Sequence, residues 1–220
     1  MPRIVILANG DLPDIAKAHA ILREDDLILC ADGGTRHAST LRLQPALVIG
    51  DLDSADETTL QTLRANGVAI EQHPRDKDET DLELAIARAL EMGPEEIVIM
   101  AALGGRLDQT LANIALLDNL QPATCNLKLD DGVEQILLCR EQSQVHGRSG
   151  DIVSLIPWQG AVSGIRTSGL KWTLQDETLH PEKTRGISNE MVSETASVAI
   201  RSGTLLIVHR RLSSIVNRKP

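Results

Sequence analysis

Residues 96–120, EIVIMAALGGRLDQTLANIALLDNL, contain one complete strand–turn–helix unit. Glu96–Ala102 is a short apolar run typical of a buried strand, and two glycines follow it. Leu107–Leu120 then predicts a helix, with apolar residues at the spacing of a buried face: Leu111, Ile114 and Leu117. A strand that runs through a short turn into a helix is the repeating unit of a parallel sheet.

The same unit recurs through the first 120 residues. Strands are expected at 3–8, 26–31, 46–50, 68–73 and 96–102. Helices are expected at 14–23, at 35–43, between Ser54 and Gly67, and after Thr80. Ser54 with Glu57, and Thr80 with Glu83, have the spacing of a capping box. This alternation predicts an N-terminal doubly wound, mainly parallel sheet with helices on both faces.

The pattern changes after residue 125. Short strands are expected at 126–130, 134–139, 151–156, 196–201 and 204–209, with a tight hairpin at Ser202–Gly203, and no long amphipathic helix follows Asp151. The predicted fold class is therefore α/β plus all-β, with a small C-terminal β-sandwich domain. We expect an α/β nucleotide-binding domain over 1–139, the sandwich over 145–212 and a tail over 213–220.

Composition excludes several classes of protein. The 220 residues carry a net charge of −9, and only 1% are aromatic, namely Trp158 and Trp172. A nucleic-acid binder needs aromatic platforms and a basic face, so no nucleic-acid partner is expected. The early apolar run Ile4–Ala8 is too short to cross a membrane or to form a signal-peptide core. Three scattered cysteines, without a CxxC pair, indicate buried free thiols in a cytoplasmic protein.

Aspartate and glycine follow nearly every expected strand of the N-terminal part. The five exits are Asn9–Asp11, Asp32–Gly34, Gly50–Ser54, Asp76–Asp81 and Gly104–Asp108. Solvated loops are often rich in these residues, so one such exit alone means little. In a doubly wound sheet, however, ligands bind beyond the carboxyl ends of the strands. Five exits of this kind predict a ring of carboxylates on one edge of the sheet.

These residue types favour the chemistry of a magnesium-bound nucleotide. An Asp-x-Asp pair such as Asp51 and Asp53 offers oxygen ligands that suit Mg²⁺ better than zinc. Glycine pairs at helix N-termini allow a phosphate to approach the backbone. Lys77 and Arg106 add positive charge. Thr80 is equally explained as a helix cap.

Six motifs in order resemble the thiamine pyrophosphokinase family. They are ADGGTRH (31–37), GDLDS (50–54), DKDETD (76–81), GGRLDQ (104–109), GLKW (169–172) and GISNE (186–190). The resemblance implies transfer of pyrophosphate from ATP to the hydroxyl group of thiamine, which gives thiamine diphosphate and AMP. It also implies Mg²⁺ as cofactor and a homodimer with the active site at the subunit interface.

The resemblance also implies a set of site residues. The catalytic residues would be Asp51, Asp53, Asp78 and Asp81, of which Asp51, Asp53 and Asp81 would bind the metal. ATP would be bound by Asp32, Gly33, Gly34, Lys77, Thr80, Gly104, Gly105, Arg106 and Asp108. Thiamine would be bound by Trp172, Ser188 and Asn189. Two positions depart from the pattern, because some relatives have Gln at position 77 and many bacterial members have His at position 109.

Other functions remain open on the sequence alone. An Asp-x-Asp after a strand also occurs in phosphatases with an aspartate nucleophile and in metal-dependent glycosyltransferases. Such a phosphatase would have Thr or Val where this chain has Ala55, and a glycosyltransferase would leave DKDETD unexplained. A non-catalytic module that binds nucleotide or thiamine is a third alternative, but it would not need so many carboxylates.

Overall fold

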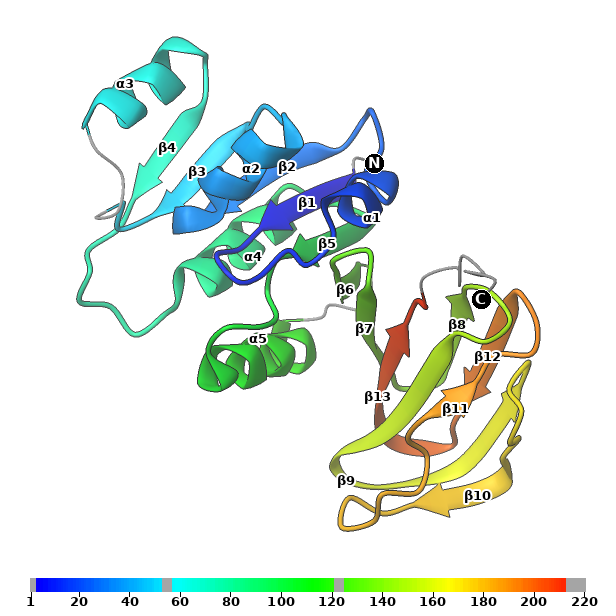
Figure 1. The fold of residues 1–220 in the computed structure, drawn as a ribbon. Coiled ribbons are helices and arrows are strands. Elements are labelled where there is room, and N and C mark those ends of the chain that lie inside the picture. The colour runs from blue at the N-terminus through cyan, green and yellow to red at the C-terminus, as the bar shows by residue number, and fades with distance from the viewer. Residues whose placement is uncertain (1–2, 53–56, 121–124, 213–220) are drawn as a thin grey trace, which may run out of the picture. The chain divides into compact units, whose positions relative to one another are not determined.

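The computed structural model describes residues 3–52, 57–120 and 125–212, and the chain divides into two compact units (Figure 1). The first unit is Met1–Gly132 and the second is Val133–Pro220. Each unit has its own hydrophobic core. No helix within the described ranges is long and apolar enough to cross a membrane.

The first unit is built on six parallel strands. In chain order they are β1 (Arg3–Leu7), β2 (Leu27–Ala31), β3 (Leu47–Gly50), β4 (Ala69–Gln72), β5 (Glu96–Met100) and β6 (Asn126–Asp130). Their order across the sheet is β4-β3-β2-β1-β5-β6, and every neighbouring pair is parallel. The order reverses at β1, which lies between β2 and β5. The carboxyl end of β1 is therefore the topological switch point, where doubly wound sheets bind ligands.

Helices cover both faces of this sheet, as predicted (Figure 1). They are α1 (Ile15–Ala20), α2 (Thr35–Leu41), α3 (Glu57–Ala65), α4 (Asp81–Glu91) and α5 (Leu107–Leu120), with a short 3-10 helix, η1, at Asp32–Gly34. Alternate residues of β1 serve opposite faces. Val5 and Leu7 share a core cluster with Ala18 of α1 and Ala38 of α2. Ile6, the residue between them, is equally buried and lies on the opposite face of the sheet, where α4 contacts β1, β2 and β3.

The helix boundaries follow local signals in the sequence. The Thr80 hydroxyl accepts a hydrogen bond from the backbone N–H of Glu83 at 3.2 Å, so the predicted cap begins α4. The predicted core face of α5 is partly wrong, because Leu111 is 53% exposed. The buried residues of α5 are instead Asn113 and Leu117. The polar Asn113 can be buried because its amide donates a hydrogen bond to the Ala102 carbonyl at 2.8 Å.

The second unit is an antiparallel β structure, and no helix occurs in its described residues. Its strands are β7 (Glu134–Cys139), β8 (Gln142–His146), β9 (Ile152–Ser168), β10 (Gln175–Leu179), β11 (Asn189–Glu190), β12 (Thr195–Ala199) and β13 (Ser202–Arg210). The two halves of the long strand β9 belong to two different layers of the β structure. Residues 152–158 pair with β11 and with most of β13, and residues 162–168 pair with β10, with β12 and with Ser202 at the start of β13. The strand changes partners near Gln159, whose φ is 61°.

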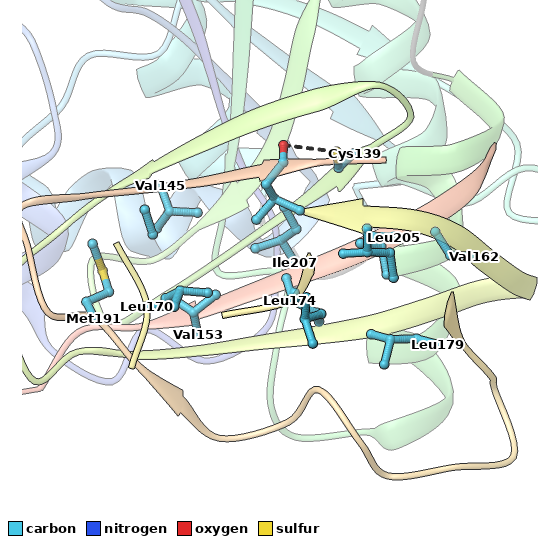
Figure 2. Close-up of a cluster of buried hydrophobic side chains, with 14 residues drawn as sticks. Cys139, Val145, Val153, Val162, Leu170, Leu174, Leu179, Met191, Leu205 and Ile207 are labelled. Carbon is cyan, nitrogen blue, oxygen red and sulfur yellow. Dashed lines mark hydrogen bonds between the residues drawn. The ribbon is translucent and has the colours of Figure 1, made fainter. Parts of the chain in front are cut away.

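The core of the second unit lies between these layers (Figure 2). Val153 and Val162, from the two halves of β9, belong to one buried cluster with Leu205 and Ile207 of β13. The cluster is aliphatic apart from Cys139 and Met191 and contains no aromatic side chain. This arrangement agrees with the predicted C-terminal sandwich.

Two details of the C-terminal prediction are wrong. The strand expected at 151–156 is the first part of the 17-residue strand β9. The hairpin expected at Ser202–Gly203 does not form, because β12 pairs with β8 and β9 whereas β13 pairs with β7 and β9. Gly203 has another role: a Cβ there would lie 2.9 Å from the Ala161 carbonyl oxygen, so a side chain would push β13 away from β9.

The three cysteines are free and buried, as expected. Burial raises the pKa of the Cys30 thiol to about 12. The thiol is therefore protonated at neutral pH and acts as a small apolar side chain.

Candidate active site

A cavity of about 540 Å³ opens in the first unit, and residues beyond the carboxyl ends of its strands line it. The exits of β1, β2, β3 and β5 contribute, together with the loop before α4 and the first turns of α5. Since the lining includes the exit of β1, the cavity lies at the topological switch point. The fold thus places the Asp- and Gly-rich exits around one hollow.

Three carboxylates meet at this cavity. Asp32, Asp51 and Asp81 each offer an oxygen, and these oxygens all lie within 4.8 Å of one another. Asp32 begins η1, Asp51 follows β3 directly, and Asp81 is the first residue of α4. All three side chains are half-buried, so their mutual repulsion is screened less than at an open surface.

The close approach of two of these aspartates depends on a glycine. A Cβ at Gly50 would lie 2.9 Å from the Asp32 Cβ. The absence of a side chain at the end of β3 therefore lets Asp32 lie against the backbone that carries Asp51. This requirement explains the glycine that opens the GDLDS motif.

Lys77 supplies positive charge beside the carboxylates. Its Nζ lies 3.0 Å from an oxygen of Asp81 and donates a hydrogen bond to the Pro74 carbonyl at 3.1 Å. The Lys77 side chain is only 13% exposed, so its charge acts inside the cavity. The lysine offsets part of the charge of the three aspartates.

The loop after β5 is shaped by glycines with positive φ. Gly104 has a φ of 80°, and a Cβ there would lie 2.3 Å from an oxygen of Asp11. Gly105 has a φ of 65°. Both conformations are open to glycine at little cost, and they bring bare backbone to the cavity wall. The loop can therefore accept a phosphate close to its backbone.

The Arg106 and Asp108 side chains, which follow this loop, form an exposed ion pair. The Arg106 Nε donates to an oxygen of Asp108 at 3.1 Å. The hydrogen bond from Arg106 lowers the pKa of the Asp108 carboxyl. Arg106 lines the cavity, and it is 72% exposed, so its guanidinium can exchange this partner for an anionic ligand.

The structure brings most of the predicted nucleotide residues together. Eight of them line the cavity: Asp32, Asp51, Lys77, Thr80, Asp81, Gly104, Gly105 and Arg106. Among the described residues, four others do not belong to its lining: Gly33, Gly34, Asp78 and Asp108. Asp53, the remaining predicted ligand, lies outside the described residues.

The glycines after β2 have a structural explanation. A Cβ at Gly34 would lie 1.9 Å from the Leu7 carbonyl oxygen, and one at Gly33 would lie 2.5 Å from the Asn9 side chain. Both glycines let η1 and α2 pack tightly against the end of β1. Neither glycine lines the cavity, and both affect its shape only through this packing.

The sequence motifs do not identify several residues that line the cavity. Asn113 is a buried polar residue within a largely apolar helix, which is a usable signal for a special role. The other unassigned polar residues are Asn9, Asp11, Arg75, Glu79 and Gln109. Arg75 directly precedes the acidic run and adds a further cation to the lining.

The predicted thiamine residues lie together in the second unit. The Asn189 amide oxygen accepts hydrogen bonds from the backbone N–H groups of Trp172 (3.1 Å) and Glu190 (2.9 Å), and its amide nitrogen donates to the Trp172 carbonyl at 2.7 Å. The Trp172 side chain is 55% exposed, and the Nζ of Lys171 lies 4.7 Å from its ring centroid. Asn189 thus holds the backbone that carries an exposed indole. Ser188, also exposed, precedes Asn189.

Both units match known families. Residues 18–129 match the family described as "Thiamin pyrophosphokinase, catalytic domain", and residues 136–205 match "Thiamin pyrophosphokinase, vitamin B1 binding domain". The chain belongs to the thiamine pyrophosphokinase family. The first match includes the three aspartates and Lys77, and the second includes Trp172 and Asn189.

Individual members of the thiamine pyrophosphokinase family are similar over nearly the whole chain. The thiamine pyrophosphokinase of Bacillus subtilis is 27% identical over 210 residues, which cover 94% of this chain and 98% of that protein. Thiamine pyrophosphokinase 2 of Arabidopsis thaliana is 28% identical over 228 residues, covering 91% of this chain and 84% of that protein. The crystal structure of the Bacillus subtilis protein has a TM-score of 0.85 at 26% identity and covers 96% of this chain and 100% of its own.

These similarities confirm the family that the sequence motifs indicated. They give no support to an aspartate phosphatase, a glycosyltransferase or a non-catalytic binding module.

Proposed function

We propose that this chain transfers pyrophosphate from ATP to the hydroxyl group of thiamine and releases thiamine diphosphate and AMP. The thiamine oxygen forms a bond to the β-phosphorus, the bond from that phosphorus to the oxygen bridging to the α-phosphorus breaks, and the hydroxyl proton is released. The observation that carries the proposal is the meeting of three carboxylates and Lys77 in one cavity of the unit that matches the catalytic domain.

The aspartate cluster fits a magnesium ion. Asp32, Asp51 and Asp81 offer hard oxygen ligands from three separate segments, close enough to share one ion. Asp53 is a further expected ligand. When bound, Mg²⁺ would neutralise charge on the phosphates of ATP.

The other cavity residues would bind and orient the triphosphate. Reactions of this type depend on positioning and charge neutralisation more than on covalent help from the protein. Lys77 and Arg106 would bind phosphate oxygens, and the Gly104–Gly105 backbone would lie against them. The N-terminus of α4, capped by Thr80, adds the positive end of a helix dipole at the same wall.

The bases of the two substrates would be bound differently. The first unit contains no aromatic residue, so adenine would rest on aliphatic and backbone surface. Thiamine would be bound in the second unit by Trp172, Ser188 and Asn189. The proposal assigns residues 1–139 to ATP and 145–212 to thiamine, in a cytoplasmic homodimer with the active site at the subunit interface.

Product analysis tests this function. The protein is incubated with ATP, thiamine and Mg²⁺, and the nucleotides and thiamine esters are separated by chromatography. We expect AMP and thiamine diphosphate in equal amounts. ADP with thiamine monophosphate, free phosphate without a thiamine ester, or binding of both substrates without turnover would each contradict the proposal.

A further inference from the structure

The loop at the end of β1 is held by two side chains of α2. His37 is buried, and its Nε2 lies 2.9 Å from the Gly10 carbonyl oxygen. Because a carbonyl oxygen only accepts hydrogen bonds, Nε2 carries the hydrogen and donates it. An Arg36 nitrogen donates to the same carbonyl at 2.9 Å and to the Asn9 carbonyl at 2.8 Å.

The opposite side of this loop is bound to the segment after β5. The Gly10 N–H donates to the Ala101 carbonyl at 2.6 Å, and the Asp11 N–H donates to the Leu103 carbonyl at 2.8 Å. A Cβ at Gly10 would lie 2.6 Å from both of these carbonyl oxygens. The loop therefore fits between α2 and residues 101–103 without spare room.

Through these contacts, His37 is connected to the cavity wall. Gly10 and Asp11 line the cavity, and the segment bound to them continues into Gly104 and Gly105. His37 lies one layer behind the lining of the described chain. Burial lowers the pKa of its imidazole, although the hydrogen bond to Gly10 opposes this effect. His37 is thus a neutral hydrogen-bond donor at pH 7.

We propose that His37 is a positioning residue for ATP: its hydrogen bond to Gly10 fixes the Asn9–Asp11 loop and, through it, the Gly104–Gly105 loop against the phosphates. This inference rests on the proposed function of the cavity. It assigns to His37 an effect on the nucleotide and none on thiamine, because the contacts that start at His37 lead to residues that line the nucleotide cavity: Gly10, Asp11, Gly104 and Gly105.

Three variants separate the hydrogen bond from the bulk of the ring. His37→Leu removes the donor, and His37→Gln restores an N–H donor near the position of Nε2. His19→Leu is the matched control, because His19 is exposed on α1 and outside the cavity. The KM values for ATP and thiamine are measured for each variant, and equilibrium binding of Mg²⁺–ATP is measured without thiamine.

We expect His37→Leu to raise the ATP KM about tenfold, the effect of one hydrogen bond, with a thiamine KM close to that of the unmodified chain. His37→Gln should recover most of the loss, His19→Leu should change neither constant, and ATP binding should weaken in parallel with KM. An unchanged ATP KM, an equal rise in both KM values, or a folded His37→Gln variant as impaired as His37→Leu would overturn the inference.

A fourth variant covers the case in which His37→Leu does not fold. Arg36→Met removes the guanidinium that donates to the Asn9 and Gly10 carbonyls. Because Arg36 is exposed, this change should not prevent folding. It should raise the ATP KM and leave the thiamine KM unchanged, and no effect on ATP would count against the inference. If the unmodified chain formed no thiamine diphosphate, the proposed function would fail, whereas the ATP-binding measurements would still decide the role of His37.

Discussion

Asp81 combines a role in folding with a role in the cavity. As the first residue of α4, its negative charge is favoured by the N-terminal end of the helix. Its carboxylate also lies 3.0 Å from the Lys77 Nζ and within the cluster formed with Asp32 and Asp51. Asparagine keeps the shape of this side chain and removes its charge, which costs the helix end only about 0.3–1 kcal/mol, so a large loss of activity would reflect the role in the cavity.

We expect Asp81→Asn to lower kcat at least a hundredfold, because a charge that binds and orients the reacting groups is lost. The melting temperature should change little, since asparagine is also tolerated at the start of a helix. Asp76→Asn, an exposed residue of the same loop, is the control. Near-normal turnover in folded Asp81→Asn would show that the aspartate cluster is not the reaction site.

Trp172 is the exposed aromatic surface of the second unit. We expect Trp172→Ala to raise the KM for thiamine more than the KM for ATP, because the indole offers a face for the thiamine rings and none for a nucleotide bound in the first unit. Steady-state kinetics with each substrate varied in turn measures both constants. A larger effect on ATP would mean that the indole serves the other substrate.

At the scale of elements, packing of η1 against β1 depends on Gly34. A Cβ at this position would lie 1.9 Å from a backbone oxygen of Leu7, and backbone has little freedom to move. We expect Gly34→Ala to lower the free energy of unfolding by about 2 kcal/mol or more, by overpacking. Denaturant unfolding measures this free energy for Gly34→Ala and for a control, Ser39→Ala, which lies on the exposed side of α2. Equal stability of the two variants would contradict this account of the glycine.

The elements of the first unit were predictable because their signals are local. The Glu96–Met100 strand and the Leu107–Leu120 helix form where they were expected, although the buried face of the helix differs from the expected one, and Thr80 caps α4 as expected. In the second unit, strand pairing depends on residues far apart in the chain. The partners of β12 and β13 are set by β9, so adjacency in sequence wrongly suggested a hairpin.

The candidate site was predictable to the extent that topology alone brings its residues together. Parallel strands end at one edge, so Asp32, Asp51 and Asp81 could be expected to meet there. The hydrogen-bond partners of Asn113 and His37 could not be predicted, because each is a backbone carbonyl that only the folded chain brings within reach. Nothing in the spacing of the sequence shows such partners.

For the molecule as a whole, a buried acid in the second unit makes stability depend on pH. Burial of the Asp151 carboxyl acts to raise its pKa, but hydrogen bonds from the N–H groups of Arg148 and Leu212 and from His209 outweigh burial, and the pKa is lowered. A lowered pKa means that the folded chain favours the ionised form. This stability is present above the pKa of the unfolded carboxyl and is lost as pH falls through the lowered value.

We therefore expect Asp151→Asn to be less stable than the unmodified chain at pH 7, by about 1–3 kcal/mol, because the amide cannot accept all of these hydrogen bonds. The difference in the free energy of unfolding between the two chains should narrow as the pH is lowered below about 4, because Asp151 of the unmodified chain then becomes protonated and no longer stabilises the fold. Denaturant unfolding at a series of pH values measures both curves. A difference that stays constant with pH would contradict the ionised role of Asp151.

The proposed function requires that a whole pyrophosphate group passes from ATP to thiamine at the aspartate cluster. Parallel reactions with ATP labelled at the β- or at the γ-phosphorus, in the unmodified chain and in Asp81→Asn, show whether it does. With the unmodified chain, we expect both labels to enter the thiamine product in equal amounts. With Asp81→Asn, we expect both labels to enter it far more slowly than with the unmodified chain. Transfer of the γ-label alone, or equal transfer by the variant, would contradict the account.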